Sequence, residues 1–168
     1  MQRRTWLKLG AVSAAVLILA GGTVALLQPG LQQGRLSPGA QDVFTSVARA
    51  ILDGTLPREP AERQAALAGL LERIDALVQA LPPHAQAELS QLLGILETGV
   101  GRRALAGLAP DWRRASVAEV QQALQSMRAS RLGLRLQSYQ AMHDIVGAAY
   151  FSDASTWPAL GYPSPLKL

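Results

Sequence analysis

The stretch "AERQAALAGLLERIDALVQALPPHAQAELSQLLGILETG", residues 61–99, decides the fold of this chain. Its leucine, isoleucine and valine residues recur every three or four positions, which is the spacing of the apolar face of an α-helix. Pro82 and Pro83 interrupt the pattern, because proline ends one helix and suits the first turn of the next. Gly99 and Gly101 then predict the end of the second helix. The stretch therefore predicts two amphipathic helices joined by a short turn.

The same spacing recurs on both sides of this stretch. It predicts a helix over residues 41–53, another that begins after Asp111 or Ser116, and a last one over about 132–150. Ser116 and Glu119 have the spacing of a capping box, which marks the start of a helix. No segment alternates convincingly between apolar and polar residues, so we predict no strands. The expected fold is all-α, a compact bundle of about five helices over residues 41–150.

Composition excludes several classes of protein. Nearly half of the 168 residues are hydrophobic and 17% are charged, which is not the composition of a disordered chain. The net charge of +4 comes mostly from Arg3, Arg4 and Lys8, without which 13 basic residues face 12 acidic ones. A body so nearly neutral argues against nucleic acid as a partner. The absence of cysteine excludes disulfides, thiolate metal sites and iron–sulfur clusters.

The first 27 residues have the layout of an export signal, with a basic start followed by an uncharged apolar segment, residues 9–27. The basic start resembles the twin-arginine signal, which directs folded proteins to the twin-arginine translocase. The alternative is an ordinary inner-membrane anchor whose basic end stays in the cytoplasm. Both interpretations place the body in the periplasm. The residues that carry the resemblance are Arg3, Arg4, Trp6, Leu7 and Lys8.

Residues 28–40 contain glycine, proline and glutamine, and are predicted to form a linker. Whether the leader is removed stays open. Small residues precede two possible cleavage points, after Gly22 and after Ala25, but both match the preferred pattern incompletely. Residues 9–27 would otherwise remain as a single membrane anchor.

The polar residues form no recognisable catalytic, cofactor-binding or metal-binding pattern. His84 and His143 are the two histidines, and neither has the spacing of a metal ligand pair. We expect His84 to be exposed at a helix start and His143 to be a hydrogen-bonded core residue. Two arginine pairs, 102–103 and 113–114, flank a predicted loop and are expected to form a small solvated basic rim.

The tail, residues 151–168, differs from the body. With Tyr150 it contains four of the eight aromatic residues, set among glycines and prolines that should keep most of it out of a helix. Such aromatics either cover their own core or bind another protein, where tryptophan and tyrosine contribute most of the affinity. The candidate partner-binding residues are Tyr150, Phe151, Trp157, Tyr162 and Pro163.

The leader, the cysteine-free helical body and the stretch "YFSDASTWPALGYPSPL", residues 150–166, together resemble the gluconate 2-dehydrogenase subunit 3 family. The segment "ARAILDGTLP", residues 48–57, is similar to the first helix of that family. Ser164 stands where glycine is expected, which is a departure because a side chain there changes the final turn.

The resemblance implies a non-catalytic small subunit of a periplasmic, membrane-associated dehydrogenase. The partner would be a flavoprotein of the glucose–methanol–choline type that carries FAD, with a c-type cytochrome as electron acceptor. The small subunit, which has no cofactor of its own, would take the folded flavoprotein through the twin-arginine pathway. Two alternatives are a stand-alone exported helical scaffold or binding protein anchored in the inner membrane and, least supported, an enzyme that uses His143 and Asp144.

Overall fold

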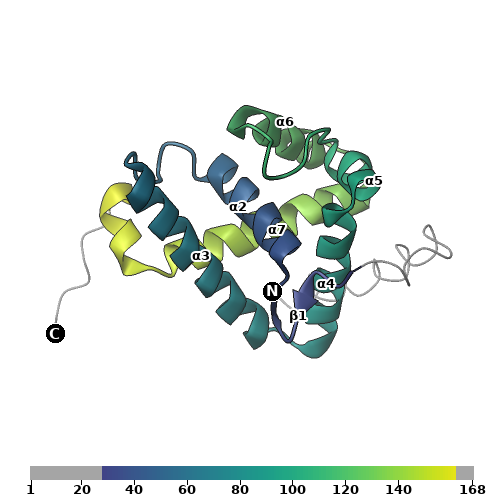
Figure 1. The fold of residues 1–168 in the computed structure, drawn as a ribbon, viewed down its shortest axis with the longest axis horizontal. Helices are drawn as coiled ribbons and strands as arrows, with labels where there is room; N and C mark the ends of the chain where they lie inside the picture. The colour runs from purple at the N-terminus through teal and green to yellow at the C-terminus, as the bar shows by residue number, and fades with distance from the viewer. Residues whose placement is uncertain (1–27, 162–168) are drawn as a thin grey trace.

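The computed structural model describes residues 28–161, and these are mostly helical (Figure 1). The predicted helices are present, and their observed bounds lie within a few residues of the predicted ones. The five long helices are α2 (Pro38–Ile51), α3 (Pro60–Ala80), α4 (Pro83–Glu97), α6 (Val117–Arg128) and α7 (Gly133–Phe151).

Local chemistry sets where these helices begin. The Ser37 hydroxyl accepts a hydrogen bond from the Ala40 amide at 3.0 Å and so caps α2. Pro60 and Pro83 occupy the first positions of α3 and α4, where a missing amide hydrogen costs nothing. The predicted capping box of Ser116 is confirmed at the start of α6.

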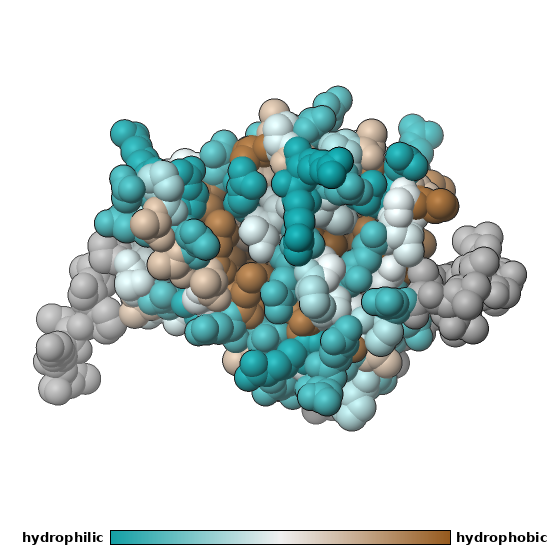
Figure 2. Space-filling view, in the orientation of Figure 1, coloured by the Kyte–Doolittle hydropathy of each residue, from teal (hydrophilic) through white to brown (hydrophobic). Residues whose placement is uncertain are grey.

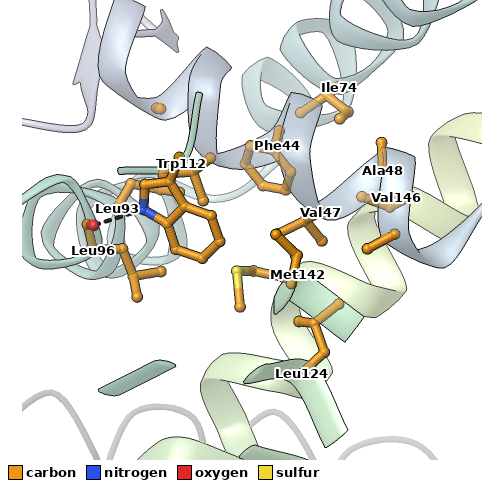
Figure 3. Packing of buried hydrophobic residues seen from close by; sticks show 14 of the residues in the cluster. Phe44, Val47, Ala48, Ile74, Leu93, Leu96, Trp112, Leu124, Met142 and Val146 are labelled. Atoms are coloured by element: carbon orange, nitrogen blue, oxygen red, sulfur yellow. Dashed lines mark hydrogen bonds between the residues drawn. The ribbon is translucent and has the colours of Figure 1, made fainter. Parts of the chain in front are cut away.

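Helix α2 is the centre of the bundle. It packs against α3, α4, α6 and α7, and Figure 1 shows it crossing the middle of the molecule. Phe44 and Val47 of α2 meet Met142 of α7 and Leu124 of α6 in the buried cluster drawn in Figure 3. Both α2 residues are fully buried. The first predicted helix therefore supplies the core that the other helices enclose.

The chain before α2 is not the plain linker that the sequence predicts. Two short strands, β1 (Leu31–Gln32) and β2 (Arg35–Leu36), pair antiparallel and form a small hairpin. Helix α2 also begins at Pro38, three residues earlier than predicted. The strands are too short to show an alternating pattern, so the prediction of no strands was wrong here for lack of a readable signal.

The segment after α4 also departs from prediction. A short helix α5 (Gly99–Gly101) and a π-helical turn η2 (Arg102–Ala106) follow, and Gly107, at φ 71°, ends them. Helix α4 ends at Glu97, and the hydroxyl of Thr98, the next residue, accepts from the Gly101 amide at 2.9 Å and caps the start of α5. Gly101 is needed for close packing, because a side chain there would collide with the carbonyl oxygen of Ile95.

Trp112 fastens this segment to two helices. Its indole N–H donates to the Leu96 carbonyl near the end of α4 at 2.8 Å, as the dashed line in Figure 3 shows. Its own carbonyl accepts from the Ser46 hydroxyl of α2 at 2.6 Å. Only 4% of Trp112 is exposed. A carbonyl in the last turn of a helix has no partner within that helix. Trp112 supplies one to the Leu96 carbonyl of α4 and also accepts from a hydroxyl inside the core.

Within the described residues, no helix is both long and apolar enough to cross a membrane. The predicted signal or anchor, residues 1–27, lies outside the described part of the chain.

Replacing Trp112 with Phe should lower the free energy of unfolding by about 1–3 kcal/mol, because it leaves the buried Leu96 carbonyl without a donor. Urea denaturation followed by circular dichroism measures this. Trp157→Phe is the matched control, since its indole bond lies near solvent and should cost under ~1 kcal/mol. Equal losses in the two variants would contradict the role given to Trp112.

Candidate functional site

The structure describes three of the five predicted partner-binding residues. Tyr150 and Phe151 end α7, and Trp157 lies in η3 (Ala154–Leu160), a 3-10 helix at one end of the bundle in Figure 1. We call residues 150–161 the tail segment. Tyr162 and Pro163 lie outside the described residues, as do the export-signal residues Arg3, Arg4, Trp6, Leu7 and Lys8.

Arg73 of α3 holds the end of α7. Its Nε donates to the Ala149 carbonyl at 2.8 Å, and its Nη1 lies 3.2 Å from Oδ2 of Asp153. A cation at this position satisfies a carbonyl of the last helical turn and opposes the negative end of the helix dipole. The sequence gives no signal for this role, since Arg73 reads as one of several charged residues on the polar face of an amphipathic helix.

The tail segment is more regular than predicted. The Ser155 amide donates to the Asp153 carboxylate at 2.9 Å, and the Thr156 hydroxyl donates to the Asp153 carbonyl at 2.7 Å. These local bonds turn the chain directly after α7 into η3. The prolines exclude a long α-helix, but Pro158 is accommodated in a 3-10 helix of seven residues.

The three aromatic side chains have different environments. Tyr150 is a core residue, 7% exposed, with its hydroxyl 3.3 Å from the Thr55 carbonyl. Phe151 is 44% exposed and meets the Tyr150 ring edge-on, with centroids 5.3 Å apart. Trp157 is half-buried, and its indole N–H donates to the Phe151 carbonyl at 2.9 Å. Of these three side chains, Phe151 and Trp157 are therefore the ones that another protein can reach.

The negative charge of the Asp153 carboxylate is stabilised by its neighbours Ser155 and Arg73. Hydrogen bonds from Ser155 and, to a smaller extent, the positive charge of Arg73 lower the pKa of the Asp153 carboxyl below its usual value. The carboxylate therefore stays ionised at neutral pH and keeps the tail segment paired with α3.

The structure departs from the predicted solvated basic rim at Arg102, while Arg103, Arg113 and Arg114 are exposed as predicted. Arg102 is buried, and its Nη2 lies 3.0 Å from Oδ1 of Asp111. Arg113 pairs with Asp42 at 2.6 Å, and this partner raises the pKa of its guanidinium. These two pairs line a pocket of about 320 Å³ in which acidic and basic side chains already neutralise each other. Sequence reasoning missed the pairing of Arg102 with Asp111, because these two residues come together only when the connection between α4 and α6 folds back.

His143 is not the core residue that its position on the apolar stripe predicts. Its side chain is 49% exposed, its ring lies beside Tyr139 with centroids 5.5 Å apart, and its Nδ1 is 3.2 Å from Oδ1 of Asp144. Helix α7 therefore turns this edge of the stripe to solvent. His84 is exposed, as expected. Residues 28–161 contain no group of three side chains able to hold a metal ion.

The described residues also form a second pocket and a mixed polar and apolar surface. On the face drawn in Figure 2, apolar side chains appear in small separate areas between hydrophilic ones. A second pocket, of about 280 Å³, lies between the connection at Gly107 and helix α6. Glu119 on its lining is held by Ser116, whose hydrogen bonds lower the pKa of the carboxyl. Its charge is therefore used in capping α6.

Comparisons with known protein families, with curated proteins and with solved structures found no match to this chain.

Acid should release the tail segment. Because the pKa of Asp153 is lowered in the folded chain, its stabilising contribution is complete at neutral pH and is lost as the pH falls below about 4. The NMR signal of the Trp157 indole N–H, followed during an acid titration, reports this release.

Asp153→Asn should show the loosened tail already at neutral pH, with no further change in acid. Asp144→Asn, which removes an exposed carboxylate on α7 and leaves Asp153 in place, should titrate as the unaltered chain does. A titration of the Trp157 signal that survives in Asp153→Asn would refute the assignment.

Proposed function

We propose that this chain is the non-catalytic small subunit of a periplasmic, membrane-associated dehydrogenase. Its leader would take a folded flavoprotein of the glucose–methanol–choline type through the twin-arginine pathway. Its helical body and tail would then stabilise that catalytic subunit, which carries FAD and passes electrons to a c-type cytochrome.

The leader and the closing motif support this proposal from the sequence side. Paired arginines before a short apolar segment suit a route that accepts folded cargo. A flavoprotein gains its cofactor during folding, so it needs such a route, and one leader can serve two chains. The stretch of residues 150–166 carries the resemblance to the gluconate 2-dehydrogenase subunit 3 family.

The observation that carries the proposal is that the tail segment presents exposed aromatic side chains on an ordered backbone. Phe151 is 44% exposed, and Trp157 is partly exposed, on a backbone that Arg73 and Asp153 fix to the bundle. Large aromatic side chains that are already ordered lose little conformational entropy when a partner covers them. The exposed aromatics Phe151 and Trp157 thus lie within the stretch, residues 150–166, that carries the resemblance.

A stand-alone exported scaffold is the second candidate, and one observation favours it. The Trp157 indole N–H already has its acceptor within the same chain, the Phe151 carbonyl. The tail segment would then only close the end of its own core.

Affinity purification from membranes of the native host tests the proposal. A C-terminal tag on this chain should recover a larger protein with the absorbance spectrum of a flavin. Recovery of the tagged chain alone, without flavin, would favour the scaffold.

Trp157→Ala should weaken the complex by ~2 kcal/mol or more, as expected for a buried aromatic at an interface. The ratio of flavoprotein to tagged chain after purification measures this. Leu132→Ala is the matched control, because Leu132 is 65% exposed but lies at the opposite end of α7. If Trp157→Ala instead lowers the stability of the isolated chain and leaves the ratio unchanged, the tail is core.

Changing Arg3 and Arg4 together to Lys should keep the charge of the leader but stop export of both this chain and the flavoprotein. Dehydrogenase activity in a periplasmic extract measures the effect. The matched control changes Arg58, in the loop before α3, and Arg63, in the first turn of α3, to Lys. This control should leave the activity unaltered. Full periplasmic activity with the altered leader would disprove joint export.

A further inference from the structure

The positive charge of the described body is concentrated in its second half. Residues 98–143 contain seven arginines and two acidic residues, whereas residues 41–97 contain four basic residues and eight acidic ones. Both acidic residues of the second half already have a role, since Asp111 pairs with Arg102 and Glu119 caps α6. The near neutrality of the whole body therefore conceals two segments of opposite charge.

Three of these arginines lie at one corner of the molecule, where α6 ends and α7 begins. Arg128 is in the last turn of α6, Arg131 is in the connection, and Arg135 is in the first turn of α7. Arg128 and Arg131 are exposed, and no acidic residue lies between them and Arg135. We call residues 128–135 the basic corner.

Arg135 holds the basic corner to the neighbouring segments. Its Nε donates to the Leu105 carbonyl of η2 at 2.8 Å, and its Nη2 donates to the Ser126 hydroxyl of α6 at 2.8 Å. The turn η2 adds a further exposed arginine, Arg103, at this end of the molecule. Among the described residues, no ion pair is recorded for any arginine of the basic corner.

The basic corner also exposes a large apolar side chain. Leu132 follows Arg131 directly, is 65% exposed, and occupies the N-cap position of α7, where no side chain caps the helix. Leucine is among the poorest N-cap residues, and a serine or aspartate there would stabilise the helix by about 1 kcal/mol. The stability of the folded chain therefore does not account for an exposed leucine among arginines at this position.

We propose that the basic corner binds the surface of an anionic lipid bilayer, with its arginines on the lipid phosphates and Leu132 at the level of the upper acyl chains. The guanidinium group matches a phosphate with two parallel hydrogen bonds. Clustered basic side chains beside an apolar one favour attachment to anionic membranes, because the charge attracts the headgroups and the apolar group leaves water.

An acidic protein surface is the other occupant that the charge would suit. Protein interfaces depend mainly on tryptophan, tyrosine and other large side chains in a packed centre. Residues 128–135 contain no aromatic residue, and their apolar contribution is one projecting leucine between charged side chains. The composition of the basic corner therefore favours the bilayer over a protein.

The basic corner and the tail segment lie at opposite ends of α7, which has 19 residues and is about 28 Å long. Figure 1 shows α5, which precedes η2, and the yellow η3 at opposite ends of the molecule. A bilayer bound at the basic corner leaves Phe151 and Trp157 uncovered. This contact involves described residues only and does not depend on the proposed flavoprotein partner.

A fluorescent label in the basic corner tests the proposal. The chain has no cysteine, so a single introduced cysteine can carry an environment-sensitive fluorophore. Ala129→Cys places the label in the basic corner, and Ala65→Cys on the exposed side of α3 is the matched control. The full chain is mixed with phosphatidylcholine vesicles, with and without phosphatidylglycerol. Because the leader is the same in every sample, a difference between the two labels reports on the body.

The emission of the label at position 129 should shift to the blue with the anionic vesicles only, and high salt should reverse the shift. The label at position 65 should not respond. Replacing Arg128 and Arg131 with Gln should raise the lipid concentration needed for half of the shift by about fivefold for each arginine. The matched replacement of Arg58 and Arg63 should leave that concentration unchanged, and all four side chains are exposed, so neither variant should unfold.

A label at position 129 that ignores the anionic vesicles, or responds equally to both kinds of vesicle, overturns the proposal. So does a full response in the variant that lacks Arg128 and Arg131. A response to a purified flavoprotein partner in the absence of lipid would make the basic corner a protein interface instead. That result would support the proposed function and reject the bilayer contact, so the two are tested separately.

Discussion

The burial of one broad face of helix α2 is the constraint on which the rest of the structure depends. Seven of its 14 residues are buried, while Pro38, Gln41 and Arg49 are exposed, and four other helices pack against the helix. The hydroxyl of Ser46 on this buried surface needs an acceptor, and the Trp112 carbonyl supplies it at 2.6 Å. Because the Trp112 indole also donates to the Leu96 carbonyl, the irregular connection between α4 and α6 is hydrogen-bonded to both α2 and α4.

The sequence predicts those parts of the fold that depend on local pattern. Apolar spacing, proline at helix starts and the Ser116 capping box place the five long helices because each signal acts within one or two turns. The hairpin and the π-helical turn depend on distant partners instead. Gly30 packs against Leu93 and Ser90, and Arg102 pairs with Asp111. The spacing of apolar residues along the chain does not indicate such contacts.

In the candidate site too, the sequence predicts the features that depend on local composition and misses those that depend on distant contacts. Composition identifies the aromatic tail as unusual, but it cannot tell the buried Tyr150 from the exposed Phe151 that follows it. That distinction comes from the rotation of α7 against α3, which Arg73 fixes from 76 positions away. His143 was misplaced for the same reason, since an apolar stripe does not show how far the neighbouring helices cover it.

Helix α3 connects the two ends of the described chain. Arg73 holds the tail segment through Asp153, and Asp75 holds the hairpin through the Leu36 amide. Positions two apart point about 200° away from each other around a helix, so the two attachments lie on nearly opposite sides of α3. The tail segment and the hairpin are therefore attached to different faces of this one helix of 21 residues, so a partner that covered the tail segment would leave the contact between the hairpin and α3 in place.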